Sequence, residues 1–392
     1  MLDFSDVPFI DHHCHPLDPD MAILTGEELA GAFMHGLGDA DEPILTGRPW
    51  GASPELRRHI TNLGVVQTMV CQLARVLDCP AELEAVAAER NRRTSESFTD
   101  YVKLLYEDAG IVATVVDSGL PIGDPILALF PGKVLRLFQM GPVMDELLKE
   151  SASYRELLQD YQEALENAVK RDGFVGVKVH LAERVGFGVD PVGEADAKLA
   201  FQAAKRGDSD GYKKLYVAIF TATLLQCQDL EVPVHLHSGT TGSVWHGGLL
   251  SDADPFLLLP FIRRPEFRES RIVLLHASTP WIMNASASVH IIPHLWVDIG
   301  WVSPWLSLRL ADCYRELMSY APLSKLMIGS GGHQTPEIAW LAAITAKIAL
   351  KEALGDAVRM GLMTTKQAER TGQMLAHDNA ARLYNLASPT LE

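Results

Sequence analysis

Short apolar runs alternate along the chain with longer segments in which apolar residues recur at helical spacing. Near-continuous apolar runs are typical of strands that a parallel sheet buries on both faces. Eight units of this kind predict an α/β protein with a (β/α)8 TIM barrel. We expect the strands over residues 9–15, 110–117, 133–138, 174–180, 232–237, 271–276, 294–299 and 325–330.

An open doubly wound sheet is the alternative to the barrel, but no Gly-x-Gly-x-x-Gly follows the first predicted strand. We expect residues 1–392 to form a single domain. Residues 16–55 mix a helical pattern with loop sequence rich in Gly and Pro, which predicts an insertion or lid after the first strand.

Composition narrows the class of protein. Hydrophobic residues make up 47% of the chain, enough for a full core, and the formal net charge is −16. This acidic balance argues against a nucleic-acid partner. Five cysteines without a Cys-x-x-Cys motif, no apolar signal core and no membrane-length apolar run predict a cytoplasmic protein with reduced thiols. A homo-oligomer is left open.

Basic side chains gather where four predicted strands end: His13, His15, Lys178, His180, His235, His237 and His276. Residues at i and i+2 of a strand point to the same face, so each pair can act together. One such histidine alone is usually a hydrogen-bonded structural residue. Burying several unpaired polar groups costs about 1–3 kcal/mol each, and a metal ion removes that cost. The pattern therefore predicts a divalent metal site.

Several motifs resemble those of the amidohydrolase superfamily of metal-dependent barrels, over nearly the whole chain. They are Ile10-Asp-His-His-Cys-His15, Gly176-Val-Lys178, Val232-Pro-Val-His-Leu-His-Ser-Gly239, Val273-Leu-Leu-His-Ala277, Ile328-Gly-Ser330 and Asp378-Asn-Ala-Ala-Arg-Leu-Tyr384. The chain is most similar to the amidohydrolase-2 branch, which includes bacterial γ-glutamylamide hydrolases and the domain fused to glutamine-synthetase-like domains in fungi.

The resemblance implies a bound divalent metal, with one or two ions. Zinc is expected first, with manganese or iron as alternatives. The implied ligands are His13, His15, His237, His276 and Lys178. In binuclear members of the superfamily the lysine at the Lys178 position is carboxylated and bridges two metals. The equal alternative is a lysine whose positive charge binds a substrate carboxylate.

One position departs from the family pattern. Where the family has Asp after strand eight, this chain has Gly331. That Asp normally contacts the metal and takes a proton from the attacking water, and losing a general base costs a factor of about 10²–10⁴ in rate. Three explanations are open: an introduced substitution, a weak or inactive relative, or a substitute group such as His333 or Asp298.

The implied activity is hydrolysis of a C–N amide bond, such as a γ-glutamyl amide, by metal-activated water. Catalytic roles then fall to the Gly331 position, His235 and Lys178. His180 and Arg184 are candidates for substrate binding, with an ion pair as the alternative role of Arg184. The substrate would be a small-molecule amide. A nonoxidative decarboxylase and a non-catalytic binding or regulatory protein are the alternative functions.

Overall fold

The computed structural model describes residues 2–33, 58–239 and 250–386 of the chain. The predicted insertion over residues 16–55 lies outside the described residues from position 34 onward. Before that point the segment holds a 3-10 turn, Pro19–Ala22, and the short helix α1, Gly26–Gly31. Thr25 caps α1, because its side chain accepts the N–H of Glu28 while the Glu28 carboxylate accepts the N–H of Thr25.

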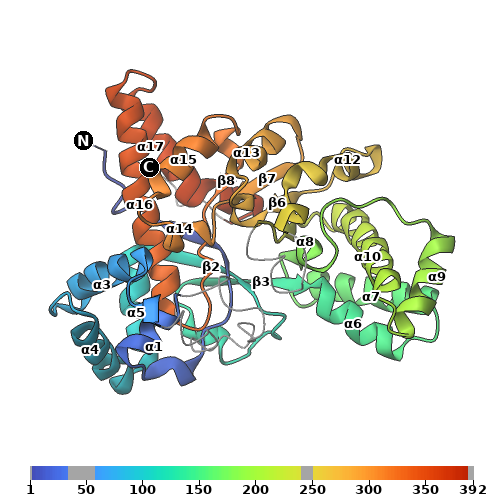
Figure 1. Ribbon diagram of the computed structural model, residues 1–392, viewed down its shortest axis with the longest axis horizontal. Helices are drawn as coiled ribbons and strands as arrows, with labels where there is room; N and C mark the ends of the chain where they lie inside the picture. The colour runs from blue at the N-terminus through green and yellow to red at the C-terminus, as the bar shows by residue number, and fades with distance from the viewer. Residues whose placement is uncertain (1, 34–57, 240–249, 387–392) are drawn as a thin grey trace. The chain divides into compact units, whose positions relative to one another are not determined.

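Eight strands follow one another in sequence order within one sheet, and helices connect them (Figure 1). The strands are β1 (Phe9–Cys14), β2 (Ile111–Asp117), β3 (Lys133–Gln139), β4 (Gly176–Val179), β5 (Val234–Leu236), β6 (Ile272–Leu274), β7 (Leu295–Asp298) and β8 (Leu326–Met327). The pairs β1–β2 and β3 through β7 are parallel. This is the topology of a (β/α)8 barrel, as the sequence predicts.

Several strands are shorter than the apolar runs that predict them. The run over 325–330 contains only two strand residues, and the run over 271–276 contains three. In both cases the backbone leaves the strand before the polar residues at its end. Ser330 and His276 therefore lie on loops that follow β8 and β6, where a barrel places its functional side chains.

Two compact units divide the chain. The first comprises Met1–Val116, Gly123–Leu135 and Asp298–Glu392, and the second comprises Asp117–Ile122 and Arg136–Val297. Each unit is described by itself below. The single domain over residues 1–392 stays a prediction.

The first unit contains β1, most of β2, β8 and a set of helices. These include α3 (Gly64–Leu77), α4 (Leu83–Glu96), α5 (Phe98–Ala109), α14 (Val302–Trp305), α15 (Leu310–Met318), α16 (Pro336–Arg359), α17 (Thr365–Gln373) and α18 (Asn379–Leu383). Helix α16 packs against α5, α14, α15 and α17. Helix α5 ends at Gly110, whose left-handed φ of 67° lets the chain turn into β2.

The second unit contains strands β4 to β6, together with helices that precede β4 or follow these strands. These helices are α6 (Met140–Glu150), α7 (Tyr154–Lys170), α8 (Leu181–Arg184), α9 (Glu194–Lys205), α10 (Ser209–Asp229), α12 (Leu259–Ile262) and α13 (Ile282–Ile291). Helix α7 buries the apolar stripe that predicts it, including Leu157, Tyr161 and Leu165. Helices α7, α9 and α10 pack on one another.

Among the described residues, every helix is too short or too polar to cross a bilayer. The cytoplasmic location stays a prediction.

Candidate metal centre

Two imidazoles lie together where β1 ends. The rings of His13 and His15 have centroids 5.0 Å apart and stand nearly perpendicular to each other. His13 is fully buried, and His15 is half-buried one residue beyond the strand. The i, i+2 spacing thus brings both rings to one side of the chain, as the sequence predicts.

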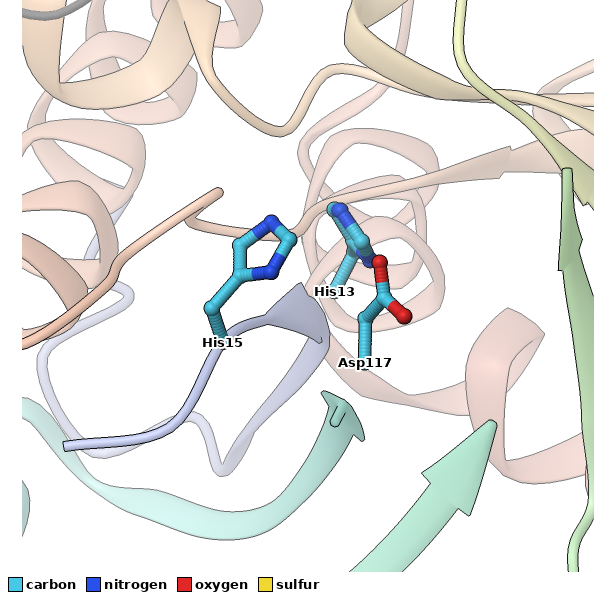
Figure 2. Close-up of side chains that lie close together, drawn as sticks. All are labelled: His13, His15 and Asp117. Carbon is cyan, nitrogen blue, oxygen red and sulfur yellow. The ribbon is translucent and has the colours of Figure 1, made fainter. Parts of the chain in front are cut away.

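Figure 2 shows His13 and His15 at the end of β1. Imidazole nitrogens are donors that zinc, manganese and iron accept.

A carboxylate of the first unit, Asp298, is buried at the end of β7. Its Oδ1 accepts the N–H of Gly300 at 2.7 Å, and its Oδ2 lies 3.4 Å from Nδ1 of His12. The hydroxyl of Tyr384 contacts the other ring nitrogen of His12 at 2.8 Å. His12 is therefore a packed and hydrogen-bonded residue, and Asp298 is held in a fixed orientation.

Gly329 makes room for this arrangement. A Cβ atom at Gly329 would lie 2.7 Å from Oδ2 of Asp298 and 2.8 Å from the backbone nitrogen of His13. Asp298 and the His13 backbone thus approach the same side of Gly329, which places the carboxylate beside the root of a predicted metal ligand.

Gly329→Ala is expected to lower the free energy of unfolding by about 1–3 kcal/mol, because its methyl group must displace Asp298 or the His13 backbone. Gly355→Ala is the matched control, since Gly355 lies in α16 with no atom within 4 Å of the added Cβ. That control should stabilise the protein by about 0.5–1 kcal/mol. Urea unfolding of both variants checks the expectation, and equal effects would contradict it.

Gly331, at the position of the family's Asp, adopts a left-handed backbone with φ of 62°. Its N–H donates to the carbonyl of His13 at 2.7 Å, and a Cβ atom there would lie 3.1 Å from Cα of Trp301. Glycine suits this turn, while Asp is among the few other residues that tolerate it. The carbonyl of Gly331 lies 3.3 Å from Nδ1 of His333, and burial lowers the pKa of that imidazole.

Ser330 and Asp11 hold the start of the same loop. The hydroxyl of Ser330 donates to Oδ2 of Asp11 at 2.6 Å, and its N–H donates to Oδ1 at 2.7 Å. Burial raises the pKa of the Asp11 carboxyl to about 7 despite these bonds. The loop after β8 is thereby tied to β1.

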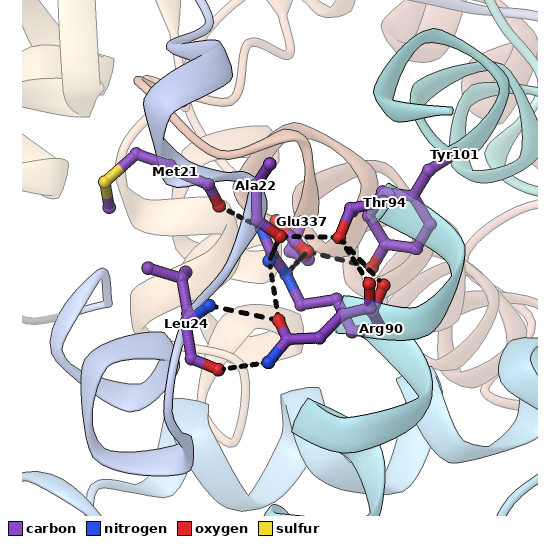
Figure 3. Close-up of polar contacts among 8 residues, drawn as sticks. Met21, Ala22, Leu24, Arg90, Thr94, Tyr101 and Glu337 are labelled. Atoms are coloured by element: carbon purple, nitrogen blue, oxygen red, sulfur yellow. Dashed lines mark hydrogen bonds and ion pairs between the residues drawn. The ribbon is translucent and has the colours of Figure 1, made fainter. Parts of the chain in front are cut away.

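A buried ion pair holds the helix that follows this loop (Figure 3). Nε of Arg90 in α4 donates to Oε1 of Glu337, in the first turn of α16, at 2.5 Å. The remaining guanidinium nitrogens donate to the carbonyls of Met21 and Ala22, and the Tyr101 hydroxyl donates to the same Glu337 oxygen. Glu337 is therefore structural.

In the second unit, Lys178 of β4 is paired with Asp117. Its Nζ donates to Oδ2 of Asp117 at 2.8 Å, and both side chains are fully buried. Gln139 donates to the other Asp117 oxygen at 2.8 Å. Lys178 lies next to His235 in the register of β4 and β5. The sequence places Lys178 and His235 at catalytic positions; the structure places them inside adjacent strands.

The second unit also brings His180, Glu183 and His237 together. Nε2 of His237 lies 3.3 Å from Oε1 of Glu183, and Nε2 of His180 lies 3.7 Å from Oε2. The ligand atoms of all three residues lie within 4.8 Å of one another. Burial raises the pKa of the Glu183 carboxyl to about 8.

His276 stands beside His237 on an unusual turn. The two ring centroids are 4.5 Å apart. The φ angles are positive, between 48° and 65°, at His276, Ala277 and Ser278. In a non-glycine residue this conformation costs about 1–2 kcal/mol of backbone strain. The hydroxyls of Ser238 and Ser278 lie 2.8 Å apart, which ties the turn to the end of β5.

Arg184 has partners of its own. Its Nη1 donates to Oδ2 of Asp145 at 2.7 Å and to the hydroxyl of Tyr212. The structure thus shows the ion pair that the sequence leaves open as the alternative role of this residue.

Sequence reasoning missed two carboxylates of the second unit: Asp117, which pairs with Lys178, and Glu183, a candidate ligand. Asp117 ends a predicted strand, as the recognised histidines do, so its position alone could have pointed to it. Glu183 follows His180 by three residues, which places both on one side of a helical turn. Acidic residues are frequent in this chain, so neither position could be told apart from other acidic residues by its sequence context.

Comparison with known proteins shows which family the chain belongs to. The sequence profile of the amidohydrolase family matches residues 157–386, which is more than half of the chain. The chain belongs to the amidohydrolase family. This match confirms the resemblance seen in the motifs. The histidines at the ends of β1, β5 and β6 are therefore candidate site residues.

The family relatives differ in length. Protein fluG of Emericella nidulans is 26% identical over 278 residues, which cover 67% of this chain and 32% of fluG. The chain therefore spans about a third of that relative's length.

Solved structures share the fold. A Lactobacillus casei protein, described provisionally as a metal-dependent hydrolase, aligns over 98% of both chains with a TM-score of 0.81 and 20% identity. Thermotoga maritima uronate isomerase aligns over 97% of this chain and 95% of its own, with a TM-score of 0.66 and 16% identity. At these identities the likeness concerns the fold alone, and one fold hosts both reactions.

The residues present fit a divalent metal. The first unit places two imidazoles side by side at the end of β1, and the second unit combines two imidazoles with a carboxylate within ligand distance after β4. Imidazole and carboxylate oxygen are the donors of catalytic zinc sites with two histidines and an acidic residue.

Proposed function

We propose that this member of the amidohydrolase family is a metal-dependent hydrolase that cleaves a C–N amide bond in a small molecule, with γ-glutamyl amides as the first class to test. The observation that supports the proposal is the pair of His13 and His15, whose rings lie 5.0 Å apart at the end of β1. This is where barrel enzymes place their chemistry.

His13 and His15 would hold the ion in this proposal. A bound divalent metal supplies a Lewis acid and lowers the pKa of its water toward neutrality. Asp298, which the N–H of Gly300 and the His12 ring hold in place within the same unit, would act as the proton acceptor. Asp298 thereby takes over part of the task of the Asp that Gly331 replaces. His333 is the second candidate acceptor, since burial lowers its pKa and keeps the imidazole neutral.

The test follows metal content and amine release together. His13→Asn/His15→Asn removes both imidazoles, and His290→Asn alters an exposed histidine of α13 as the matched control. We expect the double variant to lose bound metal by elemental analysis and to lose at least about 10²-fold in kcat/KM on γ-glutamyl amides. The control should keep both. Absence of metal and of amine release in the unaltered protein would overturn the proposal.

Two further outcomes assign other functions. Release of carbon dioxide from a small carboxylic acid, without amine, would identify a decarboxylase. Bound metal without turnover, also in Gly331→Asp, would identify a binding or regulatory protein. If the missing Asp limits the rate, Gly331→Asp should raise amine release by about 10-fold or more, since a general base contributes about 10²–10⁴ and the turn strains the new residue.

A further inference from the structure

We propose that His180, Glu183 and His237 form a three-ligand site for a divalent transition metal, in which Glu183 supplies the carboxylate. The inference deepens the proposed function, since it rests on metal binding by this chain, but it does not require amide hydrolysis.

Donor spacing supports the site. Two donors on a tetrahedral ion with bonds of about 2.1 Å lie roughly 3.4 Å apart. The distances from the Glu183 carboxylate oxygens to Nε2 of His237, 3.3 Å, and to Nε2 of His180, 3.7 Å, bracket this value. All three ligand atoms lie within 4.8 Å. Small side-chain movements would suffice to place them around one ion.

The backbone holds two of these ligands on one short turn. His180 precedes α8 and Glu183 lies within it, so the three-residue spacing puts both side chains on one side of the turn. The N–H of Arg184 donates to the carbonyl of His180, and the N–H of Gly186 donates to that of Leu181. The N–H of His180 donates to the hydroxyl of Tyr216. The turn is therefore ordered before any ion binds.

The third ligand is fixed from the neighbouring strand. The N–H of His237 donates to the carbonyl of Val179 at 3.0 Å, which continues the pairing of β4 and β5 beyond its last strand residue. This bond brings His237 beside the turn that carries Glu183. Gly239 then leaves the strand with φ of 86°, and a Cβ there would lie 2.5 Å from the carbonyl oxygen of Thr279. The position of His237 is thus set on both sides.

Burial gives Glu183 a reason to bind a cation. Its side chain is 3% exposed and lies beside two imidazoles that are themselves largely buried. An ionised carboxylate in such surroundings is costly unless a cation compensates it. A divalent ion shared with two imidazoles supplies this compensation.

Lys178 forms an ion pair with Asp117 in the same unit. Its ammonium donates to Oδ2 of Asp117 at 2.8 Å, with both side chains fully buried, and Gln139 satisfies the other Asp117 oxygen. Asp117 is engaged by these two side chains, and Glu183 is the carboxylate that lies beside His180 and His237.

The donor set indicates the class of metal. Two histidines and one carboxylate bind zinc in catalytic sites and iron(II) in others, and both leave coordination positions open for water or substrate. Cobalt(II) replaces zinc in such sites and gives them a visible absorption spectrum, so it serves as the probe.

The first experiment titrates chelator-treated protein with cobalt(II) in the His13→Asn/His15→Asn background, which removes the two imidazoles at β1. We expect one ion per chain, with a visible band. Glu183→Gln should weaken the apparent affinity at least about 10-fold and change that band. Glu166→Gln, an exposed acid of α7 paired with Lys170, is the control and should bind as the background does. Equal binding by both variants would overturn the site, as would a background that binds no cobalt.

A second variant completes the test. If Glu183→Gln fails to fold, His180→Gln replaces it with the same readout. Cobalt bound through Glu183 without amine release from any amide would refute the proposed hydrolysis alone. Amine release unaffected by Glu183→Gln, with unchanged cobalt binding, would refute this inference alone.

Discussion

Arg90→Met is expected to lower the free energy of unfolding by about 3–5 kcal/mol, because it leaves the Glu337 carboxylate buried without its cation. Both side chains are fully buried, so water cannot replace the lost guanidinium. The same change removes the donors to the carbonyls of Met21 and Ala22, which anchor the chain after β1. Chemical unfolding followed by circular dichroism measures the effect.

Arg92 is the matched control for this prediction. It lies two residues further along α4, is about half exposed, and pairs with Glu89 and Glu96 on the same helix. Exposed pairs of this kind contribute about 0–1 kcal/mol, so Arg92→Met should change stability little. Similar losses of unfolding free energy in the two variants would show that the buried pair stabilises the protein no more than an exposed pair does.

Asp117→Ala is expected to cost about 3–5 kcal/mol of unfolding free energy in chelator-treated protein, since it leaves the Lys178 ammonium buried without a carboxylate. The double variant Asp117→Ala/Lys178→Met should recover most of this loss, because it leaves no uncompensated charge. The coupling energy of the cycle should therefore exceed about 1 kcal/mol.

The pair of Glu166 and Lys170 on α7 provides the control cycle. Both side chains are more than half exposed, and they stand four residues apart on one helix. Its coupling energy should be about 0.3–0.5 kcal/mol. Additive losses in the Asp117 and Lys178 cycle would mean that the two residues do not act as a pair.

Local periodicity determined the strands and the ligand pair of β1. Apolar runs that must be buried on both faces predict parallel strands without knowledge of their neighbours. The two-residue repeat of a strand likewise brings His13 and His15 to one side, and their rings do lie 5.0 Å apart. These features depend on residues close in sequence.

Strand ends were less predictable than strand centres. The sequence run that ends at His276 gives no sign that the last residue turns into a left-handed conformation. That turn is tied to the end of β5 by the contact between the hydroxyls of Ser278 and Ser238, 40 residues earlier, which no local pattern contains.

Only the tertiary structure decided the partners of the charged residues. The pairing of Lys178 with Asp117 joins residues 61 positions apart, and that of Arg90 with Glu337 joins residues 247 apart. Sequence left Lys178 open between a metal ligand and a cation that binds a substrate carboxylate, because no local pattern shows which carboxylate the fold places beside it. The register of parallel strands and the packing of helices set these neighbours. The sequence therefore determined which residues are available for metal chemistry, and the tertiary structure decided which of them are already bound to one another.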